Sequence, residues 1–126
     1  MNEKFGKEYK LCSKKLIAEI FEKGKHVKAY PYFLHYLPAE LNSATSFQVV
    51  ISAPKRNFKK AVDRNRIKRL TREAVRKNKH LLESAFSERN QKFALFLIYT
   101  GKEEESFQTI MHKIETLFMR LVENTK

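Results

Sequence analysis

The sequence predicts a small α+β protein in which helices lie on a mixed β-sheet. Of its 126 residues, 42% are hydrophobic and 32% are charged, with only three Gly and three Pro, which is typical of a compact folded chain. Three segments carry apolar residues at helical spacing, and three others are short, rich in aromatic and β-branched residues, and bounded by Pro or polar turns. We expect residues 1–126 to form a single domain.

The first predicted helix spans residues 13–23. Ser13 is a suitable N-cap, and Gly24 is expected to end the helix in a left-handed conformation. One face carries the apolar residues Leu16, Ile17, Ile20 and Phe21.

Two strands are predicted next. Residues 32–37 begin after Pro31 and stop at Pro38, as a strand bounded by prolines does. Residues 47–52 alternate, so that one face carries Phe47, Val49 and Ile51. The turn-prone residues 42–45 join the two strands.

The second half of the chain predicts helix, strand and helix. A basic helix is expected over residues 61–82, separated by Pro54 from the strand before it. Residues 93–99 are apolar on both faces, which favours a strand inside the sheet with cover on both sides. The last helix has an apolar stripe from Phe107 to Leu121. The acidic residues 103–105 are expected at its positive N-terminal end, which explains them more simply than a metal site does.

Positive charge is concentrated around the predicted basic helix. Residues 55–79 contain 12 Lys and Arg but only Asp63 and Glu73, so they hold a net +10 of the chain's +12. Arg64 and Arg66 flank an apolar stripe made by Ile67, Leu70 and Ala74. The opposite face gathers the polar residues Asn65, Lys68, Arg69, Arg72, Arg76 and Lys79.

This charge pattern indicates a polyanionic partner. A merely solvated helix face usually mixes signs, whereas this face has almost no acid to pair with. Crowded like charges repel one another unless a polyanion relieves them. A helix that lies on a membrane would carry bulkier insertion residues such as Trp or Phe. We therefore expect nucleic acid.

Catalytic and metal-binding patterns are missing. The four His lack ligand spacing, Cys12 has no second Cys beside it, and no acid pair or Gly-rich phosphate loop is present. We expect no catalytic residue and no metal ligand in the protein. The chain has no long apolar run and no apolar signal stretch after Met1, so we expect a cytoplasmic location.

The basic helix resembles a known family. Residues 61–74, Ala-Val-Asp-Arg-Asn-Arg-Ile-Lys-Arg-Leu-Thr-Arg-Glu-Ala, resemble the signature of the bacterial ribonuclease P protein subunit, whose hallmark is Arg-Asn-Arg followed by a basic helix. Upstream, residues 9–11, 20–21 and 24–25 also match the opening segment of that family. The resemblance covers nearly the whole chain and is weakest over residues 78–91 and near both termini.

The resemblance implies a fold and a role. The fold would be ribosomal protein S5 domain 2-like, with a left-handed βαβ crossover through the basic helix. The protein would be the non-catalytic subunit of a ribonucleoprotein that removes the 5′ leader from precursor tRNA. Cleavage would be performed by the catalytic RNA, with Mg²⁺ bound mainly by that RNA and none by the protein alone.

The resemblance also implies two sets of site residues. The set expected to contact the catalytic RNA is Lys55, Arg56, Arg64, Asn65, Arg66, Lys68, Arg69, Arg72 and Arg76. The cleft expected to receive the single-stranded leader contains Ile17, Phe21, Phe33 and His35.

Two positions depart from the family pattern. Ile17 stands where many members have Phe, which removes one ring from the expected cleft. The loop of residues 55–60, Lys-Arg-Asn-Phe-Lys-Lys, replaces the more usual Lys-Lys-X-Gly-Asn and exchanges a flexible Gly for further charge.

Other classes of protein share parts of the pattern. A structural RNA-binding protein, such as a ribosomal protein, would use the same basic helix without a role in cleavage. A helix-turn-helix DNA-binding protein needs another helix just before the basic one, where a strand is predicted. A protein nuclease acting alone needs an acid cluster that the sequence does not offer.

Overall fold

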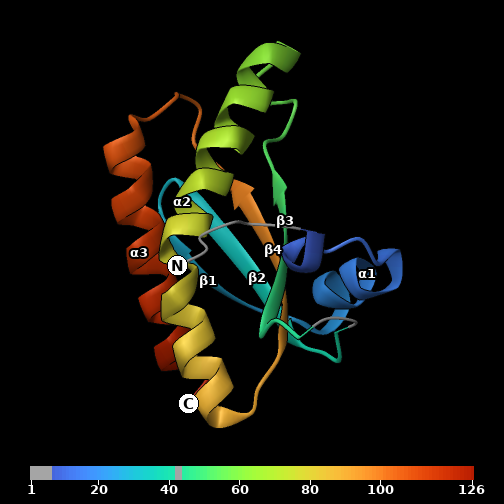
Figure 1. Ribbon diagram of the computed structural model, residues 1–126. Coiled ribbons are helices and arrows are strands. Elements are labelled where there is room, and N and C mark those ends of the chain that lie inside the picture. Colours follow the sequence, from blue (N-terminus) through green and yellow to red (C-terminus); the bar gives the residue numbers. More distant parts are fainter. Residues whose placement is uncertain (1–6, 42–43) are drawn as a thin grey trace.

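The computed structural model describes residues 7–41 and 44–126 and confirms the predicted α+β class. Three α-helices, a short 3₁₀ helix and four strands follow one another in the described chain (Figure 1). Their bounds are η1 Lys7–Tyr9, α1 Lys14–Lys23, β1 Lys25–Ala29, β2 Tyr32–Pro38, β3 Phe47–Ser52, α2 Ala61–Arg89, β4 Phe93–Tyr99 and α3 Phe107–Asn124. Positions 42 and 43 of the predicted turn lie outside the described residues.

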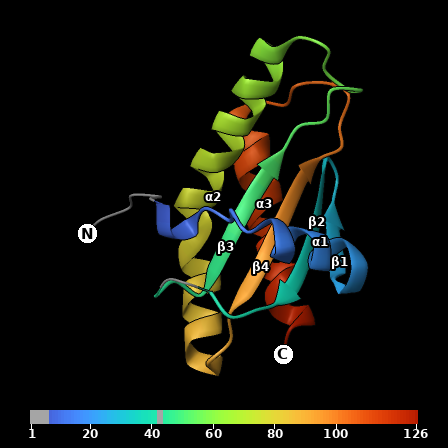
Figure 2. The same cartoon turned by 90° about the vertical axis from the view of Figure 1, so that its right-hand side faces the viewer.

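The four strands form one mixed sheet in the order β1-β2-β4-β3. The central strand β4 runs antiparallel to β2 and parallel to β3. Figure 2 shows β3 and β4 pointing the same way with α2 behind them and β4 to the right of β3, so the crossover through α2 is left-handed, as expected. Helices α2 and α3 cover one face of the sheet and α1 lies on the other (Figure 2).

The main core lies between the sheet and the pair α2 and α3. Alternate residues of β2 and β4 face these helices and are buried, including Tyr32, Leu34, Leu95 and Leu97. A smaller core beneath α1 is made of Leu11, Ile20 and Ala94. Cover on the second face of β4 is therefore only partial, because Phe96 and Ile98 remain half-buried.

Strand β1 was not predicted from the sequence. It pairs with β2 at one edge of the sheet, and only Val27 and Ala29 of its five residues are buried. The other three are Lys25, His26 and Lys28, so the apolar alternation was too short to indicate a strand.

Helix α2 ends at Arg89 instead of the predicted residue 82. Beyond Leu82 only Phe86 is buried, so residues 83–89 carry too little apolar pattern to extend the prediction. The buried face of the helix also includes the polar Thr71 and Asn78. Thr71 shares a 2.6 Å hydrogen bond with Tyr32, and the Asn78 side-chain amide donates to the Ala74 carbonyl at 3.0 Å. These bonds satisfy the buried polar groups and let the helix continue to Asn90, a left-handed C-cap.

Two local expectations were wrong. Gly24 is extended, with φ −73° and ψ 162°, and not left-handed. Glycine is needed there because an added Cβ would lie 2.4 Å from the Ile20 carbonyl oxygen. The acidic residues 103–105 lie before α3 and not in its first turn, since the N-cap is Ser106, whose hydroxyl accepts a 3.2 Å hydrogen bond from the Thr109 amide. Within residues 7–41 and 44–126, no helix is long and apolar enough to span a membrane.

Candidate nucleic-acid interface

Arg64, the first residue of the Arg-Asn-Arg motif, fastens the loop that leads into α2. Its guanidinium donates hydrogen bonds to the carbonyl oxygens of Phe58 at 2.8 Å and Lys59 at 2.9 Å. The N-cap residue Lys60 makes no side-chain capping bond. Arg64 therefore orders the start of the helix in addition to carrying charge.

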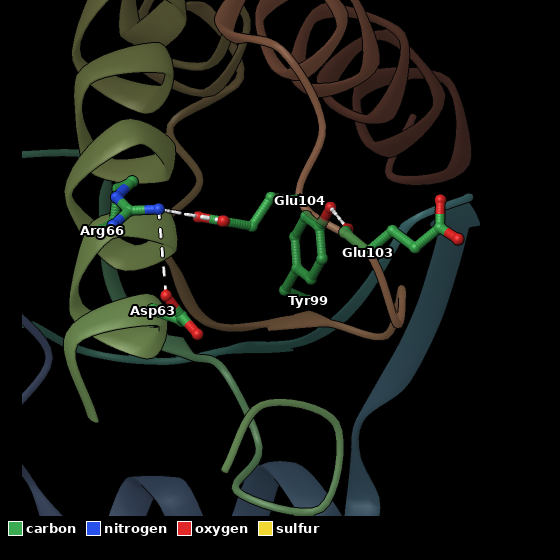
Figure 3. Close-up of polar contacts among 5 residues, drawn as sticks. All are labelled: Asp63, Arg66, Tyr99, Glu103 and Glu104. Carbon is green, nitrogen blue, oxygen red and sulfur yellow. Dashed lines mark hydrogen bonds and ion pairs between the residues drawn. The ribbon is translucent and has the colours of Figure 1, made fainter. Parts of the chain in front are cut away.

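Arg66, the third residue of the motif, pairs with the acidic segment that precedes α3. Its guanidinium contacts both carboxylate oxygens of Glu104, at 2.9 and 3.0 Å, and lies 3.8 Å from Asp63 (Figure 3). The Tyr99 hydroxyl donates to the Glu103 carbonyl at 2.5 Å and holds the same segment in place (Figure 3). Burial raises the pKa of Tyr99 to about 12, so this hydroxyl remains a donor at neutral pH.

Only some of the polar and basic side chains predicted on α2 are unpaired. Arg76 is held by Glu73, and its hydrogen bond lowers the pKa of that carboxyl group. Lys79 lies 5.2 Å above the Tyr9 ring. In contrast, four predicted contact residues make no side-chain hydrogen bond or ion pair with any described residue, namely Asn65, Lys68, Arg69 and Arg72. Lys55 and Arg56 are exposed in the loop before the helix and are equally unpaired within the described chain.

The predicted leader residues meet on the sheet face that α1 only partly covers. The Phe21 ring of α1 is 54% exposed and lies 5.1 Å from His35 and 4.8 Å from Phe96. Phe33 lies 4.8 Å from His35, whereas Ile17 packs half-buried into the small core beneath α1. We call the set Phe21, His26, Phe33, His35 and Phe96 the aromatic surface.

Two members of the aromatic surface were missed from the sequence. His26 stacks on Phe33 with ring centroids 4.6 Å apart and an interplanar angle of 24°. Its position was invisible because β1 itself was not predicted. Phe96 pairs with His35 across β2 and β4, and the alternation of β4 could have identified it, since even-numbered residues of that strand face away from the main core.

The aromatic surface is suited to bind nucleobases by stacking more than by charge. Burial lowers the pKa of His35, and the neighbouring His26 lowers it further, so its ring is uncharged at neutral pH. Uncharged rings offer flat apolar faces to nucleobases.

No metal centre is found in the described part of the chain. Within residues 7–41 and 44–126, no three His, Cys, Asp or Glu side chains gather where they could hold an ion.

The fold and these two surfaces define an α+β RNA-binding protein with unpaired cations on a long helix and partly exposed rings on the opposite side of its sheet. A family model described as Ribonuclease P matches residues 5–122. The chain belongs to the bacterial ribonuclease P protein family, and is thus a protein component of a ribonucleoprotein endoribonuclease in tRNA processing.

Curated relatives agree with the family match. The ribonuclease P protein component of Porphyromonas gingivalis is 32% identical over 108 residues, which cover 86% of this chain and 79% of the relative. That of Pseudoalteromonas translucida is 29% identical over 122 residues, which cover 97% and 80%.

Solved structures share the fold. The ribonuclease P protein from Thermotoga maritima superposes with a TM-score of 0.70 at 23% identity, covering 88% of this chain and 96% of that one. The Staphylococcus aureus protein superposes with a TM-score of 0.66 at 19% identity, covering 91% and 96%.

Proposed function

We propose that this protein binds the catalytic RNA of ribonuclease P through the basic side of α2 and binds the 5′ leader of precursor tRNA on the aromatic surface. The RNA performs the cleavage, and the protein assists it. The observation that carries this proposal is the separation of two RNA-binding chemistries, since the unpaired cations and the rings lie on opposite sides of one sheet.

The basic side of α2 suits the phosphates of a folded RNA. Lys68, Arg69 and Arg72 have no acid partner among the described residues, so phosphates can replace water around them without breaking an ion pair. Such contacts release counterions and make affinity fall as salt rises. Arg64 and Arg66 contribute charge from fixed positions, because their side chains are already held.

The aromatic surface suits a single strand. Proteins hold single-stranded RNA by stacking bases on rings, and Phe21 and His35 present such rings beside each other. Precursor tRNA has an unpaired leader and mature tRNA does not, so this surface distinguishes substrate from product.

In this proposal the RNA performs the cleavage and holds most of the Mg²⁺. A structural RNA-binding protein without a role in cleavage is the alternative, and family membership favours the subunit of an endoribonuclease over it.

Reconstitution tests the role in cleavage. Protein alone should not cleave precursor tRNA with any metal. The ribonuclease P RNA alone should cleave poorly at low Mg²⁺, and addition of the protein should restore cleavage. Cleavage by RNA-free protein, or no effect of the protein at low Mg²⁺, would contradict the proposal.

The leader assignment has its own test. His35→Ala should weaken holoenzyme binding of precursor tRNA by at most the ~1–3 kcal/mol of one base–aromatic stack, and leave mature tRNA binding unchanged. His112→Ala on α3 is the matched control, because His112 is exposed and remote from the aromatic surface. Equal losses for precursor and mature tRNA would show that His35 supports the fold or the RNA interface instead.

A further inference from the structure

We propose that His26 forms a second base-stacking position for the leader, at the free edge of β1, distinct from the position that Phe21 and His35 provide. This inference rests on the proposed function, because it assumes that the leader lies on the aromatic surface. The inference adds His26 as a residue that determines specificity. It also lengthens the stretch of leader bound to the protein beyond the first site, which Phe21 and His35 form.

The register of the sheet places His26 in line with the first site. His26 pairs with His35 across β1 and β2, and His35 pairs with Phe96 across β2 and β4. Because paired residues project from the same face of a sheet, these three rings form one row across three strands. A strand of RNA that starts at Phe96 and crosses the sheet therefore reaches His26 last.

His26 and His35 require two different bases. The rings of His26 and His35 lie 6.1 Å apart and are inclined at 61°, so they cannot sandwich one base between them. His26 instead lies nearly parallel to Phe33. This stacking fixes the plane of the exposed imidazole and prepares its outer face for another ring.

The surroundings of His26 suit the sugar and phosphate of that nucleotide. A hollow of about 330 Å³ borders His26 at the edge of the sheet, and it is lined by His26, Val27, Lys28, Arg120, Glu123 and Asn124. Lys28 and Arg120 bring two exposed cations to it, and the Arg120 guanidinium donates to the Lys28 carbonyl oxygen. The single acid, Glu123, is engaged by Lys126 at 3.1 Å. The side chains that line the hollow therefore carry a net positive charge, which attracts a phosphate.

A leader-length series tests the proposal. Holoenzyme reconstituted with ribonuclease P RNA is titrated with precursor tRNAs whose leaders are lengthened one nucleotide at a time. The wild type should gain affinity in steps. His26→Ala should match the wild type for short leaders and bind long leaders about fivefold or more weakly, the effect of losing one stack. His26→Phe should restore the loss because it keeps the ring, and His112→Ala should have no effect.

The outcomes separate the two proposals. A loss in His35→Ala without any loss in His26→Ala overturns the second position and leaves the leader assignment intact. No leader-dependent loss in either variant overturns the leader assignment itself. A His26→Ala loss of equal size for every leader and for mature tRNA also overturns the second position, because it marks a structural role; circular dichroism of the free variants identifies misfolding directly.

Discussion

Arginines that look alike in the sequence of α2 do different things in the folded protein. Arg64 ties down two loop carbonyls and Arg66 holds Glu104, whereas Arg69 and Arg72 have no partner in the described chain. Glu104, which Arg66 contacts most closely, is 38 residues away in sequence, so no local pattern could have shown this pairing. We therefore expect some arginines of α2 to affect the stability of the protein and others to affect its affinity for RNA.

A pair of single substitutions tests that separation. Arg72→Ala should leave the melting temperature unchanged, lower the affinity for ribonuclease P RNA, and reduce the logarithmic salt slope by roughly 0.7–0.9 for one lost phosphate contact. Arg64→Ala should lower the free energy of unfolding, since each lost hydrogen bond contributes about 0.5–1.5 kcal/mol. Thermal unfolding and binding titrations at several salt concentrations measure both effects. A destabilised Arg72→Ala with unchanged affinity would refute the assignment.

At the scale of elements, strong periodic patterns were predictable and weak ones were not. Strands β3 and β4 have the predicted bounds, and α1 begins after the predicted N-cap Ser13. Strand β1 was missed because an edge strand needs only two buried residues. The last two turns of α2 were missed because Phe86 is the only buried residue of the helix beyond Leu82, which leaves too little apolar pattern to indicate a helix.

The missed end of α2 gives a prediction about stability. Phe86 is fully buried and its ring lies 4.7 Å from that of Phe93, so the last turns of the helix belong to the core. Phe86→Ala should lower the free energy of unfolding by about 3–5 kcal/mol, measured by urea denaturation. Ser87→Ala is the control in the same turn, since Ser87 is exposed and should change stability little. A Phe86→Ala loss below about 1 kcal/mol, which approaches the scale of a surface substitution, would place this segment outside the core.

At the scale of the whole molecule, the fold distributes two chemistries over one small sheet. The count of basic residues in the sequence was enough to locate the basic side of α2. Residues 55–79 are close in sequence, so their net charge of +10 stays together in the folded protein. Three of the five rings of the aromatic surface, Phe21, Phe33 and His35, were predicted only through the family resemblance, and the other two were missed. Its rings come from α1, β1, β2 and β4, and only the sheet register and the position of α1 bring them together.

The concentration of charge predicts opposite effects of salt on the free protein and on its complex. A net charge of +12 makes the folded state repel itself, and sodium chloride screens this repulsion as the Debye length falls from about 10 Å at 0.1 M to about 3 Å at 1 M. The melting temperature of the free protein should therefore rise with salt, whereas its affinity for ribonuclease P RNA should fall. Exposed ion pairs such as Arg66 with Glu104 are weakened by salt, but each contributes only about 0–1 kcal/mol.

A charge-reversal variant provides the control for this salt effect. Arg69→Glu with Arg72→Glu lowers the net charge by two per substitution, from +12 to +8, without touching a buried residue. Its melting temperature should be higher than that of the wild type at low salt and should depend less on salt. A wild-type melting temperature that falls as sodium chloride rises would mean that ion pairs outweigh the repulsion. In that case the basic side of α2 would already be neutralised within the protein, and few unpaired cations would remain to bind the phosphates of an RNA.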